Sequence, residues 1–88
     1  MVGQGSRQLR ISKQAQKAIM ALPAKQRERI KHAVARLLEG DTAGMDIKPL
    51  AGHPNEYRLR VGGIRVLFIA DAEMLFIFKA GPRGDAYK

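Results

Sequence analysis

Residues 56–87 read EYRLRVGGIRVLFIADAEMLFIFKAGPRGDAY and contain three short apolar runs separated by two turn signals. The first turn signal is Gly62-Gly63 and the second spans residues 71–73. Runs of this length, rich in β-branched and aromatic residues and bounded by such turns, are typical of paired strands. The stretch therefore predicts a three-stranded antiparallel meander.

The lengths of the two turns predict which residues face one another across this sheet. A two-residue loop at 62–63 places Arg60 opposite Arg65, and a three-residue loop at 71–73 places Lys79 opposite Arg65. A second loop of two or four residues would instead turn Lys79 to the other face. Like charges directly opposite one another are destabilising, by up to about 1 kcal/mol. A row of three cations therefore predicts a site for an anion, with phosphate as the best match.

Strand alternation divides the predicted sheet into a cationic and an apolar face. Arg58 and Arg60 lie on the cationic side. Three apolar residues, Leu67, Ile69 and Ile77, share that side, so we expect it to meet a base, a partner protein or both. The helices are expected to cover the opposite face, which comprises Tyr57, Leu59, Val61, Ile64, Val66, Phe68 and Ala70.

The first half of the chain predicts a short strand and two helices. Apolar and polar residues alternate over Gln8–Ile11, as they do in a strand. Ser12 suits the N-cap of a helix running to Leu22. Pro23 stops that helix and suits the first position of a second helix over residues 24–39. Both helices carry an apolar stripe. They are therefore predicted to form a hairpin whose shared apolar face packs against a sheet.

Residues 40–56 are predicted to be a connecting loop. Gly40 is placed to end the second helix, and Lys48 is expected to point outward from the loop. His53 beside Pro54 is most simply a turn residue. The alternative is a general base that the loop brings near the site, because histidine titrates in the right range.

Length, charge and composition limit the class of protein. Eighty-eight residues predict one domain, residues 1–88, and 16 Lys and Arg against 8 Asp and Glu give a net charge of +8. That charge favours a polyanionic partner, nucleic acid first and an acidic protein second. Cysteine is absent, which excludes disulfides and Cys-based metal sites. No apolar run approaches the roughly 18 residues of a membrane span, so we expect a cytoplasmic protein.

The predicted fold class is α+β. It comprises a short N-terminal strand, a helical hairpin and a three-stranded antiparallel meander, with the helices packed on one sheet face. In this order, four motifs resemble the RelE branch of the RelE/ParE superfamily of toxins from bacterial toxin–antitoxin pairs. They are Leu-Pro at the helical bend, Pro-Leu-Ala-Gly at 49–52, YRLRVGGIRV at 57–66 and AGPRGDAY at 80–87.

The resemblance implies an RNA endonuclease that cleaves mRNA, commonly in the ribosomal A site, without a metal or cofactor. A ribose 2′-OH attacks the adjacent phosphorus and leaves a cyclic phosphate and a 5′-OH. The implied partners are a cognate antitoxin with an acidic, flexible segment, in a toxin–antitoxin hetero-oligomer, and mRNA on the ribosome.

The resemblance also implies roles for five residues. Arg65 and Arg83 match positions that bind the scissile phosphate and stabilise its developing charge, a role that suits arginine. Tyr87 matches a C-terminal tyrosine that stacks on or orients the substrate. Arg58 and Arg60 match positions where basic residues, often lysine, lie in active members.

A guanidinium has a pKa above about 12 and is not a ready general base. Either one of four other residues supplies the base, or the protein works slowly. The four are Lys48, Lys79, His53 and Tyr87, and the two lysines are also expected to bind RNA. Two rival functions remain open at this point. One is a gyrase poison of the ParE branch, and the other is a non-catalytic basic module that binds RNA or protein.

Overall fold

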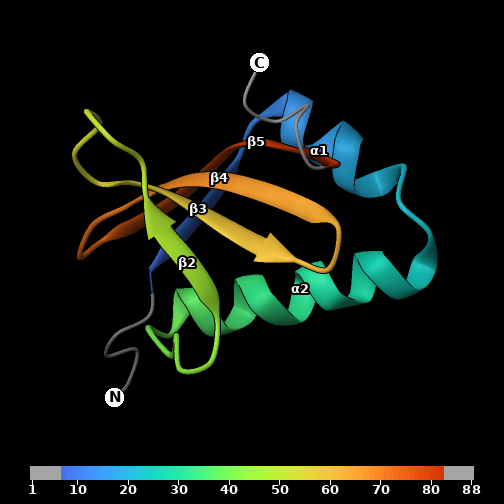
Figure 1. Ribbon diagram of the computed structural model, residues 1–88, viewed down its shortest axis with the longest axis horizontal. Helices are drawn as coiled ribbons and strands as arrows, with labels where there is room; N and C mark the ends of the chain where they lie inside the picture. Colours follow the sequence, from blue (N-terminus) through green and yellow to red (C-terminus); the bar gives the residue numbers. More distant parts are fainter. Residues whose placement is uncertain (1–6, 83–88) are drawn as a thin grey trace.

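Two helices and five strands make up residues 7–82, the part of the chain that this computed structural model describes (Figure 1). Two predicted site residues, Arg83 and Tyr87, lie outside the described residues. The elements in chain order are β1 Gln8–Ile11, α1 Lys13–Met20, α2 Ala24–Leu38, β2 Asp46–Pro49, β3 Glu56–Val61, β4 Ile64–Ala70 and β5 Met74–Pro82.

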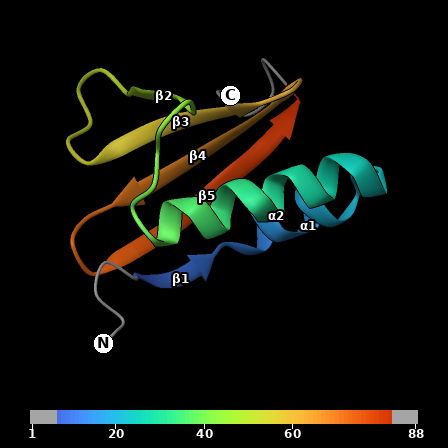
Figure 2. The same ribbon diagram turned by 90° about the horizontal axis from the view of Figure 1, so that it is seen from below.

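The five strands form one mixed sheet in the order β1-β5-β4-β3-β2. The last three strands form the predicted antiparallel meander, and β1 joins it in parallel beside β5. Both helices lie on one side of this sheet, as Figure 2 shows. The α+β class and the placement of the helices are therefore confirmed. Besides the meander, the sheet contains the predicted strand β1 and one further strand, β2.

Residues 46–49 form an edge strand where the sequence predicted a loop. β2 pairs antiparallel with β3, and Ile47 lies opposite Leu59. The strand has only four residues and ends in Pro49. Proline is tolerated on an edge, because the N–H that it lacks is not needed by a neighbouring strand. So short a run gives little alternation to detect, and its pairing with β3 is what makes it a strand.

The predicted helix boundaries hold to within two residues. Ser12 caps α1, since its hydroxyl accepts a hydrogen bond from the Ala15 N–H at 3.1 Å. Pro23 is the N-cap of α2 rather than its first residue, because its ψ of 153° is extended. At the other end, Gly40 has φ 79° and follows the C-cap Glu39, as predicted.

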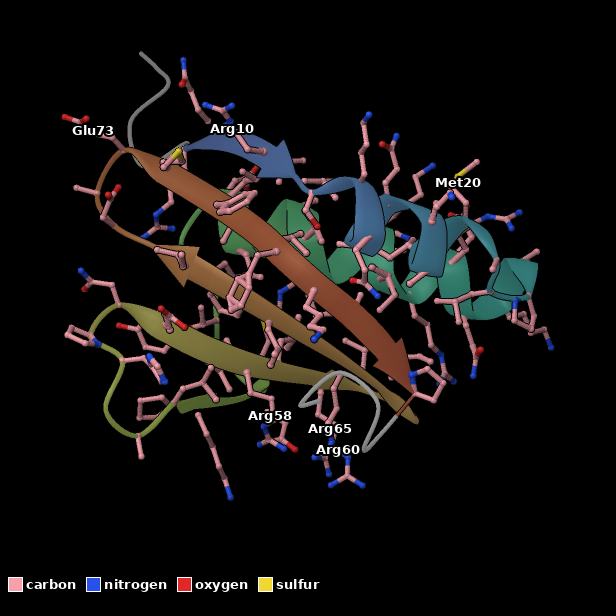
Figure 3. The ribbon with its side chains drawn as sticks, turned by 90° about the horizontal axis from the view of Figure 1, so that it is seen from above. Arg10, Met20, Arg58, Arg60, Arg65 and Glu73 are labelled. Carbon is pink, nitrogen blue, oxygen red and sulfur yellow. The ribbon has the colours of Figure 1, made fainter. Side chains whose placement is uncertain are left out.

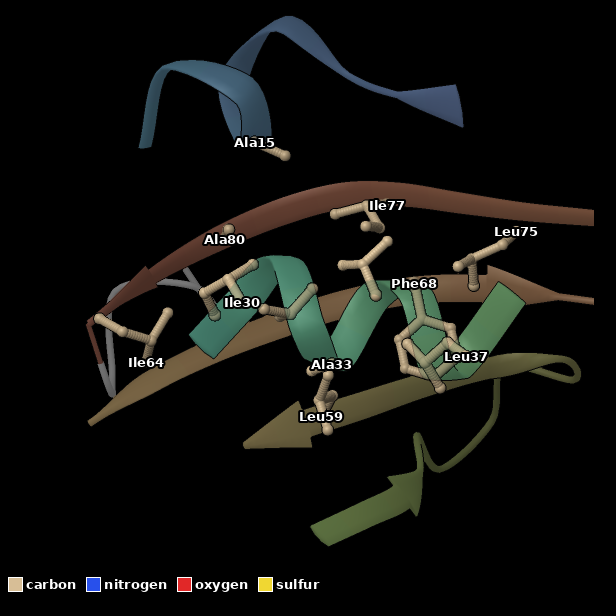
Figure 4. Close-up of a cluster of buried hydrophobic side chains, with 12 residues drawn as sticks. Ala15, Ile30, Ala33, Leu37, Leu59, Ile64, Phe68, Leu75, Ile77 and Ala80 are labelled. Carbon is tan, nitrogen blue, oxygen red and sulfur yellow. The ribbon is translucent and has the colours of Figure 1, made fainter. Parts of the chain in front are cut away.

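The core lies between the helices and the strands they cover, as Figure 4 shows. Ala15 of α1 and four residues of α2 supply one side, and alternate residues of β3, β4 and β5 supply the other. The most deeply buried large side chains are Ile30, Leu59, Leu75, Ile77 and Val66. The predicted apolar face of the meander is thus the helix-covered face.

The connection between β4 and β5 is one residue longer than predicted. Ala70 pairs with Leu75, which leaves residues 71–74 between the paired positions. The Asp71 carboxylate accepts hydrogen bonds from the N–H groups of Glu73 and Met74, both at 2.8 Å. These two bonds hold the pKa of Asp71 below its ordinary value of 3.8. A carboxylate-stabilised turn of four residues therefore replaces the predicted loop of three.

A β-bulge in β5 offsets the longer loop. Leu67 pairs with Lys79 while Phe68 pairs with Ile77, so Phe78 is the extra residue. Ser12 holds the bulge, because its N–H donates to the Ile77 carbonyl and its hydroxyl donates to the Phe78 carbonyl, each at 2.9 Å.

The longer loop and the bulge together change which side chains share a face. Ile77 packs in the core with 0% of its surface exposed, so its predicted place on the cationic side is wrong. Lys79 returns to the side of Arg65, but its partner across the strands is Leu67. Arg65 instead lies opposite Gly81. The predicted row of three cations is therefore wrong in its third member.

Candidate active site on the helix-free face of the sheet

The side of the sheet turned away from the helices carries a group of five cations on β2, β3, β4 and β5. We call this surface the cationic face. Figure 3 shows the side chains of Arg58, Arg60 and Arg65 gathered at one end of β3 and β4. Alternation and the cross-strand register add two lysines, so that the cationic face comprises Lys48, Arg58, Arg60, Arg65 and Lys79.

Its first row contains two arginines directly opposite each other. Arg60 of β3 pairs with Arg65 of β4, as the hairpin at 62–63 predicted. Gly62, with φ 60°, makes that tight turn possible. The row continues to Asp46 on one side and to Gly81 on the other. On the β5 side, therefore, no large side chain stands directly opposite Arg65.

The second row is two residues further along each strand. It runs Lys48, Arg58, Leu67 and Lys79 across β2, β3, β4 and β5. Leu67 lies between Arg58 and Lys79 and is buried, with 5% of its surface exposed. The sequence had predicted an exposed apolar residue at this position. The lysines flank the row, with Lys48 exposed and Lys79 partly exposed.

Arg58 is the one buried charge among residues 7–82, with 8% of its surface exposed. Its guanidinium donates a hydrogen bond to the Asp46 carboxylate at 3.0 Å. A buried cation needs such a partner. Asp46 is the residue of this site that the sequence reasoning missed, because it belongs to the strand predicted as loop. The only signal for it is the polar–apolar–polar alternation of residues 46–48.

Replacing Asp46 by alanine should destabilise the protein by about 1–2 kcal/mol, because it leaves the Arg58 charge buried without its carboxylate. This value is below that of a fully buried pair, since the Asp46 side chain is 47% exposed. Asp41→Ala is the matched control. It breaks an Asp–Arg pair in which both side chains are largely exposed, so the loss should be smaller. Equal midpoints for the two variants in urea denaturation would contradict the structural role of Asp46.

Arg60 and Arg65 remain the cations best placed for an anion. Arg60 is exposed, and no carboxylate of residues 7–82 lies within ion-pair distance of it. Arg65 is partly buried near the start of β4, the middle strand of the sheet, so its backbone is fixed by pairing on both sides. Within the same residues, no group of three His, Asp or Glu side chains is arranged to hold a metal ion.

His53 lies in a turn, the simpler of its two predicted roles. Its N–H donates to the Leu50 carbonyl at 3.2 Å, and its own carbonyl accepts from the Glu56 N–H at 3.1 Å. Its imidazole Nδ1 is 3.8 Å from a Glu56 carboxylate oxygen. Of the four proposed bases, the described structure therefore places Lys48 and Lys79 on the cationic face.

Solved structures similar to this protein come from bacteria and archaea. The archaeal RelE–RelB complex of Pyrococcus horikoshii contains a chain with 28% identity and a TM-score of 0.74, over 92% of this chain and 99% of that one. The RelB–RelE complex of Methanococcus jannaschii gives 24% identity and 0.75, over 89% and 94%. Isolated E. coli RelE gives 22% identity and 0.73, over 93% and 92%. Neither a protein-family model nor a curated protein sequence matches the chain.

The fold is thus that of the RelE chains in these structures. The proteins matched over nearly their whole length include RelE from two archaea and from E. coli. This chain is RelE-like, which confirms the resemblance carried by its motifs. Neither helix within residues 7–82 has the length and apolar character needed to cross a bilayer.

Proposed function

We propose that this protein is the toxin of a toxin–antitoxin pair and a metal-independent mRNA endonuclease that acts on the ribosome. The observation that carries the proposal is the directly opposed pair Arg60–Arg65 on the helix-free face of a RelE-like fold. Opposed like charges are destabilising by up to about 1 kcal/mol, and a bound phosphate reverses that repulsion. The planar guanidinium also matches phosphate geometry better than any other side chain.

The reaction needs a proton acceptor, a charge stabiliser and a proton donor. The ribose 2′ oxygen loses its proton and bonds to the adjacent phosphorus. The bond from phosphorus to the 5′ oxygen then breaks, and that oxygen takes up a proton, which leaves a cyclic phosphate and a 5′-OH. Arg65 is assigned to the charge that develops on the phosphoryl oxygens. Arg60 is assigned to holding the substrate phosphate beside it, and Arg83, by resemblance, shares the task of Arg65.

Lys79 and Lys48 are the proposed base and RNA-binding residues of the described face. Lys79 lies one row from Arg65 on the neighbouring strand, at the bulge that turns it to this side. Lys48 lies at the outer end of the same row, across Arg58. Only the neutral amine accepts a proton. Tyr87, by resemblance, orients the substrate.

The proposed antitoxin binds the same face through an acidic, flexible segment. The archaeal relatives are complexes of RelE with RelB, and this chain carries a net charge of +8. A disordered acidic segment can wrap a mixed cationic and apolar surface and neutralise it. Loss of affinity on charge reversal at Arg60 supports this masking. Hydrogen-exchange protection confined to α1 and α2, with affinity unchanged by that reversal, would exclude it.

Primer extension on a reporter mRNA after induction of the protein tests the function. We expect new 5′ ends within the coding region, absent when the antitoxin is co-expressed. Cleavage of programmed ribosomes but not of free mRNA in vitro would establish the dependence on the ribosome. DNA breaks with an intact mRNA pool would instead indicate a gyrase poison. Absence of both kinds of damage would indicate a binding module.

A further inference from the structure

An aromatic strip adjoins the cationic face and is not used by the proposed chemistry. We define it as Ile69 of β4 with Phe76 and Phe78 of β5. Ile69 pairs with Phe76, and Phe76 pairs in turn with Arg10 of β1. Each of the three apolar side chains is only partly buried. The strip therefore forms the third row of the helix-free face, beyond the row of Leu67 and Lys79.

Alternation brings Phe78 to the same side as Phe76, and the bulge then adds Lys79 to that side. Leu75 and Ile77 face the helices with 0% exposure, so Phe76 between them faces the other side. Phe78 puts a second ring beside it, with the two ring centroids 6.3 Å apart and the planes tilted by 42°. Lys79 follows immediately and also faces this side. The bulge thus places a cation beside two rings that share a face.

The packing of the core gives no reason for these rings. The core contacts of β5 are made by Leu75, Ile77 and Ala80, and neither phenylalanine belongs to the buried cluster. Two partly exposed rings next to five cations are unusual for a surface that faces water alone. Charged grooves with adjacent rings are the arrangement that binds single-stranded nucleic acid, because cations follow the phosphates and rings stack on the bases.

The spacing of the rows suits a short stretch of strand. Residues on one face of a strand are about 6.8 Å apart, so the row of Ile69 lies about 14 Å along β4 from the row of Arg65. Lys79 stands between the two, and Arg10 stands beyond the rings. An RNA strand with one phosphate at the Arg60–Arg65 pair therefore passes Lys79 before one of its bases reaches the aromatic strip.

We propose that Phe76 and Phe78 form a stacking platform for a base of single-stranded RNA, next to the phosphate site of the cationic face. This inference rests on the proposed function for its substrate class, and it adds a subsite that reads the flat surface of a base rather than its hydrogen-bonding edge. Stacking of this kind tolerates any base, because every base has a π-face.

Binding of two short RNA oligonucleotides tests the platform. One carries all its bases, and the other has the same phosphates with abasic sites, and both carry 2′-O-methyl groups so that no 2′-OH can attack. Phe78→Leu keeps apolar volume and removes the ring. We expect it to weaken binding of the complete oligonucleotide about 5- to 150-fold in fluorescence anisotropy. Binding of the abasic oligonucleotide should not change.

Two control variants separate stacking from charge. Phe78→Tyr keeps the ring and should bind both oligonucleotides like the natural protein. Arg60→Ala should weaken both alike and reduce the slope of log affinity against log salt by about 0.7, the value for one phosphate contact on a single strand. Phe78→Leu should leave that slope unchanged. Circular dichroism checks that each variant is folded.

The platform is excluded if the natural protein binds the complete and abasic oligonucleotides equally well. It is also excluded if Phe78→Leu weakens only the binding of an acidic peptide, because the strip then serves a protein partner. These outcomes are independent of cleavage. Discrimination between the two oligonucleotides without mRNA cleavage would retain the platform and refute the nuclease, and the reverse result would retain the nuclease alone.

Discussion

Replacing Arg65 by alanine should lower the single-turnover rate of mRNA cleavage on programmed ribosomes about a hundred- to a thousandfold. The backbone of Arg65 is fixed by pairing on both sides of β4. Its guanidinium belongs to the row at which the phosphate is proposed to bind. A donor of this kind stabilises charge that develops mainly in the transition state and is typically worth about 2.7–4 kcal/mol. By the family resemblance, Arg83→Ala should give a loss of similar size.

Lys31→Ala is a matched control, because it removes one positive charge from an exposed ion pair with Glu28 on α2. It should cleave at close to the natural rate. Arg65→Lys separates charge from geometry, since lysine keeps the charge and loses the planar donor group. If a folded double variant, Arg65→Ala with Arg83→Ala, cleaved mRNA at the natural rate, the assignment of both arginines to the active site would be wrong.

Replacing Ile77 by alanine should destabilise the fold by about 2–5 kcal/mol, because it leaves a cavity in a fully buried part of the core. Ile69→Ala is the matched control. It removes the same atoms from a partly exposed position on the opposite face of the sheet, so the loss should be well under half as large. Urea denaturation with circular dichroism gives both values.

The comparison of these two isoleucines also tests the four-residue loop that sets the register of β5. A regular β5 with the three-residue loop would put Ile77 on the same face as Ile69, and the two substitutions would then have similar effects. Equal losses of unfolding free energy would therefore contradict the register of β5. They would also remove the reason for placing Phe78 and Lys79 together.

Local signals were sufficient for much of this fold. The Gly62-Gly63 pair fixes a tight turn, and the turn fixes the pairing of Arg60 with Arg65. Ser12 and Gly40 mark helix ends through their own backbone and hydroxyl chemistry. Each of these predictions depends on residues that lie within a few positions of one another in the chain, which is why sequence reasoning reached them.

The features that the sequence did not reveal depend on distant contacts. The bulge at Phe78 is held by Ser12, which is 66 residues away. The strand at Asp46–Pro49 exists through its pairing with β3, and the Asp46–Arg58 contact exists only once that pairing has formed. An added residue reverses the side-chain alternation of a strand without changing its composition. The pairing of Arg60 with Arg65 was therefore predictable from the sequence. The positions of Asp46, Phe78 and Lys79 around that pair were not.

The double use of Ser12 has a consequence for the order of folding. Its hydroxyl accepts the capping bond of α1 and donates the bond that holds the bulge of β5. The helical hairpin and the hairpin of β3 and β4 need only contacts close in sequence, whereas this junction must close a loop of nearly the whole domain. We infer that docking of the first strand is a late kinetic event.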